Sequence, residues 1–277
     1  MANTLIRRSI VLSASLLVLI AISSSASTVI WGGTAQPYSY AGYFVDPTDG
    51  STVPAPGGIL TFGATASPYS GWVFATSLLN LWKVPVTVGG TPEYMGTYAT
   101  VVMADVAFDP DSGILYGTAG SYGSGELYTI DYANFCCGLT LLGASMSGVQ
   151  ALGFGPGGIY GADIGGGIWL LDPKTLQLSF VGGTGIFGIT DLAYDSFTRS
   201  LIAVSVGIKC YPFPNPCGTE TGMIWSIDPQ TAALVLLNDN APPIYGLAAL
   251  TPEPGSIVMF ATGAVGLFAA VRRRLIR

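Results

Sequence analysis

A unit of four short apolar patches recurs along the middle of this chain, and it limits the fold more than any other feature. The first patch begins at Asp105, at Gln150 and at Asp191, reading Asp-Val-Ala-Phe-Asp-Pro, Gln-Ala-Leu-Gly-Phe-Gly-Pro and Asp-Leu-Ala-Tyr-Asp. Each unit continues with a second apolar patch, a third with an aromatic residue before an apolar one, and a fourth. Four short strands in a unit of about 40 to 50 residues are typical of β-propeller blades.

One aromatic residue marks the third patch of every unit, so these residues count the units. The anchors are, in chain order, Tyr43, Trp82, Tyr128, Trp169 and Trp225. Their spacings are 39, 46, 41 and 56 residues, and the longest interval holds an insertion with two cysteines. The spacing predicts five blades, and six shorter blades or an open arrangement are the alternatives.

The two ends of the repeat region complement each other. Segments 29–32, 43–45 and 51–53 read as the second, third and fourth strands of a blade that lacks its first strand. Residues 244–250 are similar to the first patch of the other units, so we expect them to supply the missing strand. Closure of the ring would remove the aggregation hazard of an open sheet edge. We therefore predict an all-β fold, a β-propeller of five four-stranded blades closed by N- and C-terminal strands.

Composition supports one domain and excludes several functions. Half of the 277 residues are hydrophobic and 9% are charged, which gives ample material for a core. Residues 27–253 hold all 16 acidic residues and only four of the ten basic ones. Their net charge of −12 argues against nucleic acid as a partner. The chain has no histidine, which removes the commonest general base and the commonest transition-metal ligand.

Residues 1–26 read as a secretory signal peptide. Arg7 and Arg8 precede an apolar run from Ile10 to Ile22, and small residues follow. Ser24-Ser25-Ala26 fits the small-x-small pattern, so we expect cleavage after Ala26. A retained membrane anchor is the alternative, but the run is short for a spanning helix of about 20 residues.

The C-terminal segment, residues 251–277, has three consecutive parts. Pro252, Glu253 and Pro254 come first, an uncharged apolar stretch over 256–271 follows, and Arg272, Arg273 and Arg274 begin a basic tail. We expect the stretch to form a transmembrane helix with the arginines in the cytoplasm and Pro-Glu-Pro outside.

This end resembles the PEP-CTERM domain of Gram-negative bacteria. The resemblance implies an exosortase as a processing partner, which would act near Pro252-Glu253-Pro254 after transient insertion of the helix in the inner membrane. It also implies delivery to the cell surface or extracellular matrix, often alongside exopolysaccharide production. An ordinary tail anchor is the alternative. Residues 27–250 would then be the exported repeat domain.

The repeat also resembles a loose bacterial set of extracellular propeller-like repeats with a hydrophobic-Asp-Pro-x-Thr turn. The turn occurs here over Leu171–Thr175 and Ile227–Thr231. Aspartate accepts hydrogen bonds from amides one or two residues on, and proline presets the turn. We interpret these aspartates as structural, with calcium ligation as the alternative; no other cofactor is expected.

Four cysteines suggest disulfides in an exported chain. Cys210 and Cys217 bracket a proline-rich loop, and we expect a bond between them that reduces the entropy of the loop. Cys136 and Cys137 are adjacent, so a vicinal disulfide, free thiols or pairing elsewhere are all open. The spacing of the four does not fit a structural zinc site.

Catalytic motifs are scarce. Gly153-Phe-Gly-Pro-Gly-Gly158 satisfies G-x-G-x-x-G, but a predicted strand follows it where a phosphate site needs a helix, so we interpret it as a turn. A Ser-His-Asp triad cannot form without histidine. Asp105 and Asp191 begin the first patches of two units, where they could face a central channel, and they are the candidates for a ligand or ion contact.

Two functional hypotheses follow. The first is a non-enzymatic surface or matrix protein whose propeller is an interaction platform for exopolysaccharide or for surface proteins. Its expected stacking residues are the loop aromatics Tyr38, Tyr40, Tyr69, Trp72 and Tyr122. The alternative is a polysaccharide hydrolase or lyase with two carboxylates about 5 to 10 Å apart in one site.

Overall fold

The computed structural model describes the central part of the chain. The described residues are 29–34, 42–55, 59, 61–69, 71–86, 90–98, 101–119, 125–134, 138–145, 148–210 and 217–250. All of them belong to one compact unit, Val29–Leu250. They form strands and turns, and none of these described residues belongs to a helix that is long and apolar enough to span a bilayer.

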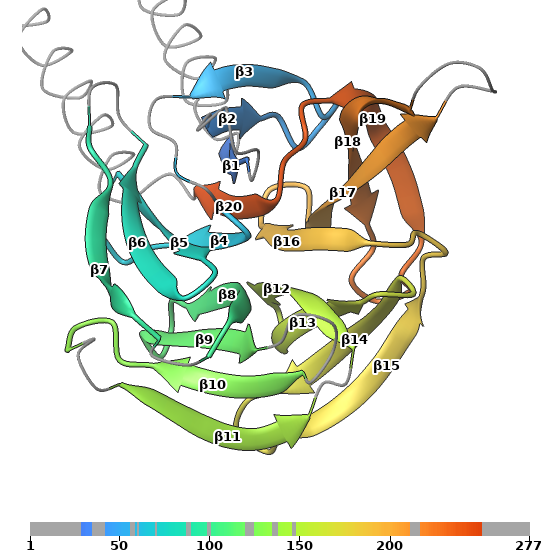
Figure 1. The fold of residues 1–277 in the computed structure, drawn as a ribbon. Helices are drawn as coiled ribbons and strands as arrows, with labels where there is room; N and C mark the ends of the chain where they lie inside the picture. The colour runs from blue at the N-terminus through green and yellow to red at the C-terminus, as the bar shows by residue number, and fades with distance from the viewer. Residues whose placement is uncertain are drawn as a thin grey trace, which may run out of the picture. The chain divides into compact units, whose positions relative to one another are not determined.

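Five four-stranded antiparallel sheets are arranged as blades around a ring, which confirms the predicted five-bladed propeller (Figure 1). We name them blades A to E in chain order. The first strand of each blade lies innermost, and these strands are β20 (Gly246–Leu250), β4 (Gly63–Ala66), β8 (Met103–Asp109), β12 (Val149–Gly155) and β16 (Ile189–Asp195) for blades A to E. Figure 1 shows them gathered at the centre of the ring.

The other strands follow outward in each blade. Blade A adds β1 (Val29–Gly33), β2 (Gly42–Val45) and β3 (Thr52–Ala55), and blade B adds β5 (Trp72–Ser77), β6 (Asn80–Pro85) and β7 (Glu93–Thr97). Blade C adds β9 (Ile114–Ala119), β10 (Glu126–Ile130) and β11 (Leu139–Ser145). Blade D adds β13 (Gly158–Asp163), β14 (Gly167–Asp172) and β15 (Gln177–Gly183), and blade E adds β17 (Ser200–Cys210), β18 (Cys217–Ile227) and β19 (Leu234–Ala241). The predicted aromatic anchors all lie in third strands.

The ring closes where the sequence predicts. β20 pairs antiparallel with β1, with Val29 opposite Leu250 and Gly33 opposite Gly246. The innermost strand of blade A therefore comes from the far end of the repeat region, while its other three strands come from the beginning. Backbone hydrogen bonds between the two ends hold the circle together.

The hydrophobic core consists of five clusters, one between each pair of neighbouring blades. The cluster between blades D and E, for example, includes Tyr160 and Ile168 from one blade and Leu192 and Leu201 from the other. The remaining four clusters join blades E and A, B and C, C and D, and A and B. Each blade is therefore buried on both faces, which explains why the inner strands read as continuous apolar runs rather than as alternating patterns.

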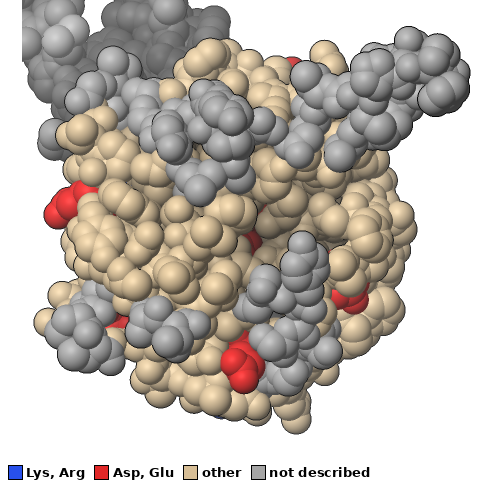
Figure 2. Space-filling view, viewed as in Figure 1, with Lys and Arg blue, Asp and Glu red and all other residues tan. Residues whose placement is uncertain are grey.

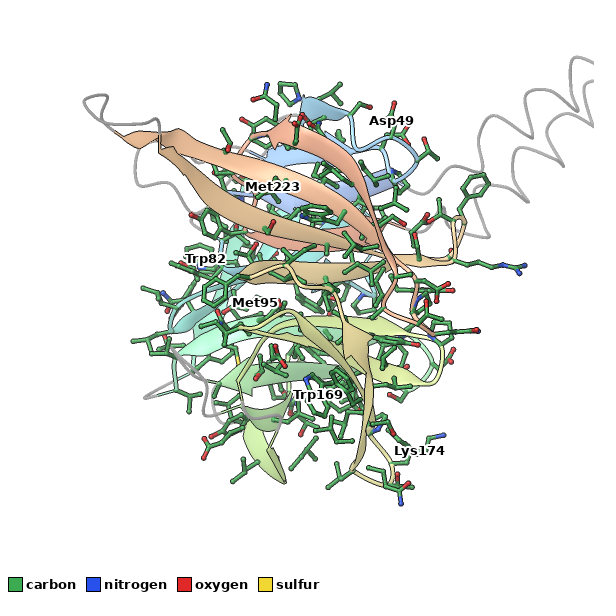
Figure 3. All side chains as sticks on the ribbon, turned by 90° about the vertical axis from the view of Figure 1, so that its right-hand side faces the viewer. Asp49, Trp82, Met95, Trp169, Lys174 and Met223 are labelled. Atoms are coloured by element: carbon green, nitrogen blue, oxygen red, sulfur yellow. The ribbon has the colours of Figure 1, made fainter. Side chains whose placement is uncertain are left out.

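The Asp-Pro turns adopt the predicted conformation. Asp172 accepts a hydrogen bond from the amide of Lys174 at 2.8 Å, and Asp228 accepts one from Gln230 at 2.7 Å. Both aspartates belong to turns between the third and fourth strands. In the side view of Figure 3, Lys174 and Asp49 lie towards one face of the ring, and Trp82 and Met223 lie towards the other. The turns that contain Lys174 and Asp49, each between the third and fourth strands of its blade, therefore share a face.

Close packing of neighbouring first strands leads to a test of the fold. A β-carbon added at Gly153 in β12 would lie 2.9 Å from the carbonyl oxygen of Leu192 in β16. We expect Gly153→Ala to lower the free energy of unfolding by about 1–3 kcal/mol, because backbone would have to move. Gly183→Ala in β15 is the matched control, since its β-carbon meets nothing within 4 Å. Urea unfolding of the full-length chain measures both, and equal losses would contradict the tight packing.

Candidate functional site on the propeller axis

Two aspartates occupy equivalent positions on the axis of the ring. Asp105 is the third residue of β8 in blade C, and Asp191 is the third residue of β16 in blade E. Each first strand is hydrogen-bonded to the second strand on one side only, so its other amides point towards the axis. The axis is therefore a convergence of backbone N–H groups that need acceptors.

Asp105 connects two blades. Its Oδ1 accepts a hydrogen bond from the amide of Val106 in its own strand, and its Oδ2 accepts one from Leu152 in β12, both at 2.6 Å. Leu152 occupies in β12 the position that Val106 has in β8. The carboxylate therefore joins the first strands of blades C and D through the same position of the repeat.

Asp191 connects three blades. Its Oδ1 accepts from the amide of Leu192 at 2.5 Å. Its Oδ2 accepts from Ala64 in β4 at 2.9 Å and from Leu247 in β20 at 2.5 Å. The two aspartates together thus accept one amide from the first strand of every blade.

The two carboxyl groups also hydrogen-bond to each other, so a proton is shared between them. Neither residue has any exposed surface. Burial, and next the negative charge of Asp191, raises the pKa of Asp105 well above its usual range. Burial also raises the pKa of Asp191, although the hydrogen bonds it accepts oppose the shift. A pair in this setting retains one proton where exposed aspartates have lost theirs.

Small residues at the equivalent positions make room for the pair. The position equivalent to the two aspartates, directly before the residue that donates the axial amide, is held by Ala151 in blade D, Gly63 in blade B and Gly246 in blade A. A β-carbon on Gly63 would collide with the carboxylate of Asp105 and lie 2.6 Å from its α-carbon. Two acidic and three small residues therefore fill the axis together.

This geometry decides what the pair can do chemically. The two candidates face the centre of the ring and meet there, where each is engaged by the other and by backbone amides. A role in ligand or ion contact stays a prediction. Among the residues that the structure describes, no group of three or more Cys, Asp or Glu side chains is placed to hold a metal ion.

Several predicted site residues lie outside the described part of the chain. They are Ala26, Cys136, Cys137, Pro252, Glu253, Pro254 and Arg272 to Arg274, together with the loop aromatics Tyr38, Tyr40 and Tyr122. The backbones of Cys210 and Cys217 are cross-strand partners at the tip of the β17–β18 hairpin, and their side chains are likewise outside the description. The predicted disulfides therefore stay predictions.

Sequence reasoning missed a second cluster, on the rim of the interface between blades B and C. Lys83 Nζ lies 3.2 Å from Glu93 Oε2. The same ammonium lies 4.4 Å from the ring centroid of Trp72 and 4.6 Å from that of Tyr69. Tyr132 of blade C contacts Tyr69 edge-on. Tyr69 and Trp72 are among the stacking residues that the sequence predicts. Their contact with Lys83 could not be predicted, because it depends on the pairing of β5 with β6.

Comparison with known proteins identifies the C-terminal signal and the fold. Residues 250–274 match the PEP-CTERM protein-sorting motif. No curated protein matches the chain.

Solved structures match the propeller at low identity. One chain of the nidogen/laminin complex is 10% identical to this chain, with 80% of this chain and 98% of that chain covered and a TM-score of 0.52. A putative 6-phosphogluconolactonase from Bacteroides fragilis is 11% identical, with 82% and 99% covered and a TM-score of 0.46. A Bacteroides thetaiotaomicron protein of unknown function is 10% identical, with 76% and 64% covered and a TM-score of 0.45. At such identities the first of these shows a shared fold and nothing of function.

The sorting motif has a direct consequence for the chain that carries it. It implies recognition by an exosortase, export, and membrane-associated sorting to the cell surface. The chain therefore combines an exosortase sorting signal with a five-bladed propeller.

Removal of the axial acceptors should destabilise the ring in proportion to the amides left unpaired. Asp191→Ala leaves three buried N–H groups without their acceptor and Asp105→Ala leaves two. We expect both to be strongly destabilising and Asp191→Ala to cost about 1–3 kcal/mol more. Asp111→Ala, at an exposed turn position, should stay within about 0.5 kcal/mol of the parent. Urea unfolding checks the order, and the reverse order would contradict this account.

The shared proton makes stability depend on pH. Folding raises the pKa of Asp105 above the 3.8 of an unperturbed carboxyl, so its contribution is complete below that pH and is lost as the pH rises through the raised pKa. The free energy of unfolding of the parent minus that of Asp105→Asn should therefore fall with rising pH, by at most about 1.4 kcal/mol per pH unit. Exposed carboxylates are common to both proteins and cancel. Parallel stability curves would contradict the prediction.

Proposed function

We propose that this chain is a non-enzymatic protein of the surface or extracellular matrix of a Gram-negative bacterium. Its propeller serves as a rigid platform that binds exopolysaccharide or other surface proteins. The sorting motif supplies the destination, because it implies export and exosortase recognition. The propeller supplies a body that holds its loops in fixed positions.

The observation that carries this proposal is that Asp105 and Asp191 accept hydrogen bonds from the backbone at the centre of the ring. These carboxylates were the strongest candidates for chemistry, and the fold engages them with five backbone amides and with each other. Further aspartates, such as Asp172 and Asp228, accept hydrogen bonds from their own turns. A structural role accounts for these acidic groups, which favours binding over catalysis.

The charge of the surface narrows the partners. The chain carries a net charge of −6, and the face of the ring in Figure 2 shows acidic side chains but no lysine or arginine among the described residues in view. Nucleic acid and strongly acidic polymers would be repelled by such a face. Neutral polysaccharides and proteins with basic patches fit it better.

Sorting is tested in a bacterium that produces both this chain and an exosortase. We expect the parent protein in the surface or matrix fraction, shortened at its C-terminus, because the enzyme acts near the Pro-Glu-Pro element. Glu253→Ala should stay in the membrane fraction with an intact C-terminus, and Glu126→Ala, an exposed change within the propeller, should be sorted like the parent. Fractionation and intact-mass analysis measure both. Equal processing of the two variants would contradict the assigned role of the motif.

Binding and catalysis are separated by one further measurement. The purified full-length chain is incubated with polysaccharide and surface proteins released from the same bacterium, and both bound material and new sugar ends are measured. A platform retains a partner and releases no new reducing or unsaturated ends. Release of such ends by the parent chain, and its loss in Asp105→Asn, would instead support the carboxylate-based hydrolase or lyase.

A further inference from the structure

We propose that the rim of the interface between blades B and C carries a binding site for neutral polysaccharide. We call it the rim cluster, and its members are Tyr69, Trp72, Lys83, Glu93 and Tyr132. This inference rests on the proposed function, because it names a partner class and a location for the platform. It is carried by the geometry of the cluster and by its charge.

The charged pair of the rim cluster is held in place before any ligand arrives. Lys83 donates to Glu93 across neighbouring strands β6 and β7, where the two residues are register partners. The rings of Trp72 and Tyr69 flank the ammonium at 4.4 and 4.6 Å. The Lys83 side chain is 19% exposed and that of Glu93 is 60% exposed. A donor and an acceptor are therefore offered to solvent from side chains whose rotamers are already restricted, which lowers the cost of binding.

The aromatic rings of the cluster are equally well supported. Tyr69 packs edge-on against Phe74 of its own blade, with centroids 6.2 Å apart, and against Tyr132 of blade C at 6.4 Å. Tyr132 in turn contacts Phe74 at 5.0 Å, and Phe74 is fully buried in the core between the blades. Tyr69 nevertheless remains 40% exposed. Buried contacts from two blades thus fix a partly exposed aromatic surface.

This combination of groups matches the chemistry of a sugar ring. A pyranose presents apolar C–H faces and a rim of hydroxyls, so it needs an aromatic surface with donors and acceptors beside it. Ligand sites in proteins commonly join aromatic side chains with a few well-placed polar groups. Tyr and Trp contribute rigid contact area with a polar end, at a small entropic cost. Lys83 supplies the donor and Glu93 the acceptor.

Charge selects a neutral polymer over an acidic one. Lys83 and Glu93 compensate each other, so the rim cluster has no net charge to attract a polyuronate. The other basic side chains that the structure describes, Lys174 and Arg199, lie in turns of blades D and E and do not reinforce it. The acidic remainder of the chain would repel an anionic chain.

Affinity electrophoresis of the full-length chain in mild detergent tests the site. The gels contain dextran, hydroxyethyl cellulose or galactomannan as neutral probes, and alginate or polygalacturonate as acidic ones. We expect retardation by at least one neutral polymer. Trp72→Ala should weaken it about tenfold or more, since Trp is enriched among the few residues that carry most of the energy of a protein interface. Phe180→Ala removes an aromatic side chain that is 58% exposed in β15, the outermost strand of blade D and not part of the rim cluster, and should bind like the parent.

A second variant tests the site with a substitution that leaves the hydrophobic core unchanged. Glu93→Gln changes a largely exposed side chain and leaves Lys83 uncompensated. We expect it to gain retardation by the polyuronates, because the rim cluster then carries a positive charge. Glu126→Gln makes the same change of net charge at an exposed position of blade C and should gain nothing.

The outcomes separate this inference from the proposed function. Retardation by a neutral polymer that persists in Trp72→Ala would overturn the rim cluster as the site, while the platform function would stand. Retardation by none of the neutral polymers would overturn the inference as well. The proposed function itself would fail only if material from the producing bacterium also gave no retained partner.

Discussion

The structure depends on the convergence of five backbone amides on two buried carboxyl groups. A ring of first strands necessarily directs unpaired N–H groups at its own axis, and buried donors without acceptors are costly. Asp105 and Asp191 satisfy one amide from each blade, and their mutual hydrogen bond joins a two-blade set to a three-blade set. Every blade is thereby connected to a single central network.

This arrangement explains why acidic residues are retained where burial penalises them. A lone buried carboxylate would be strongly unfavourable, but one proton and five donors distribute the charge of this pair. The same contacts engage the carboxylate oxygens of both residues with backbone amides, which favours a structural role over a role in catalysis. We therefore place the proposed binding function outward, at the rims and loops that the rigid centre supports. The rim cluster around Lys83 is the place that we propose for it.

The sequence was sufficient for the blades and their closure, because a repeat of four patches and a missing first strand are local patterns. The equivalence of Asp105 and Asp191 also placed both near the axis. It could not show that they meet, because blade D lies between their blades and contributes only Ala151 at that position. The rim cluster could not be predicted from the sequence for a similar reason. Glu93 meets Lys83 through the register of β6 with β7, and Tyr132 comes from another blade.

The closing strand β20 has a consequence for the order of events during export. Its last residue, Leu250, is also the first residue of the match to the sorting motif. Blade A remains one strand short, and the axial amide of Leu247 is missing, until this stretch has crossed the membrane. If the N-terminal end crosses the membrane first, β20 can pair with β1 only at the end of translocation. The closed propeller therefore forms only after the whole repeat region has crossed the membrane.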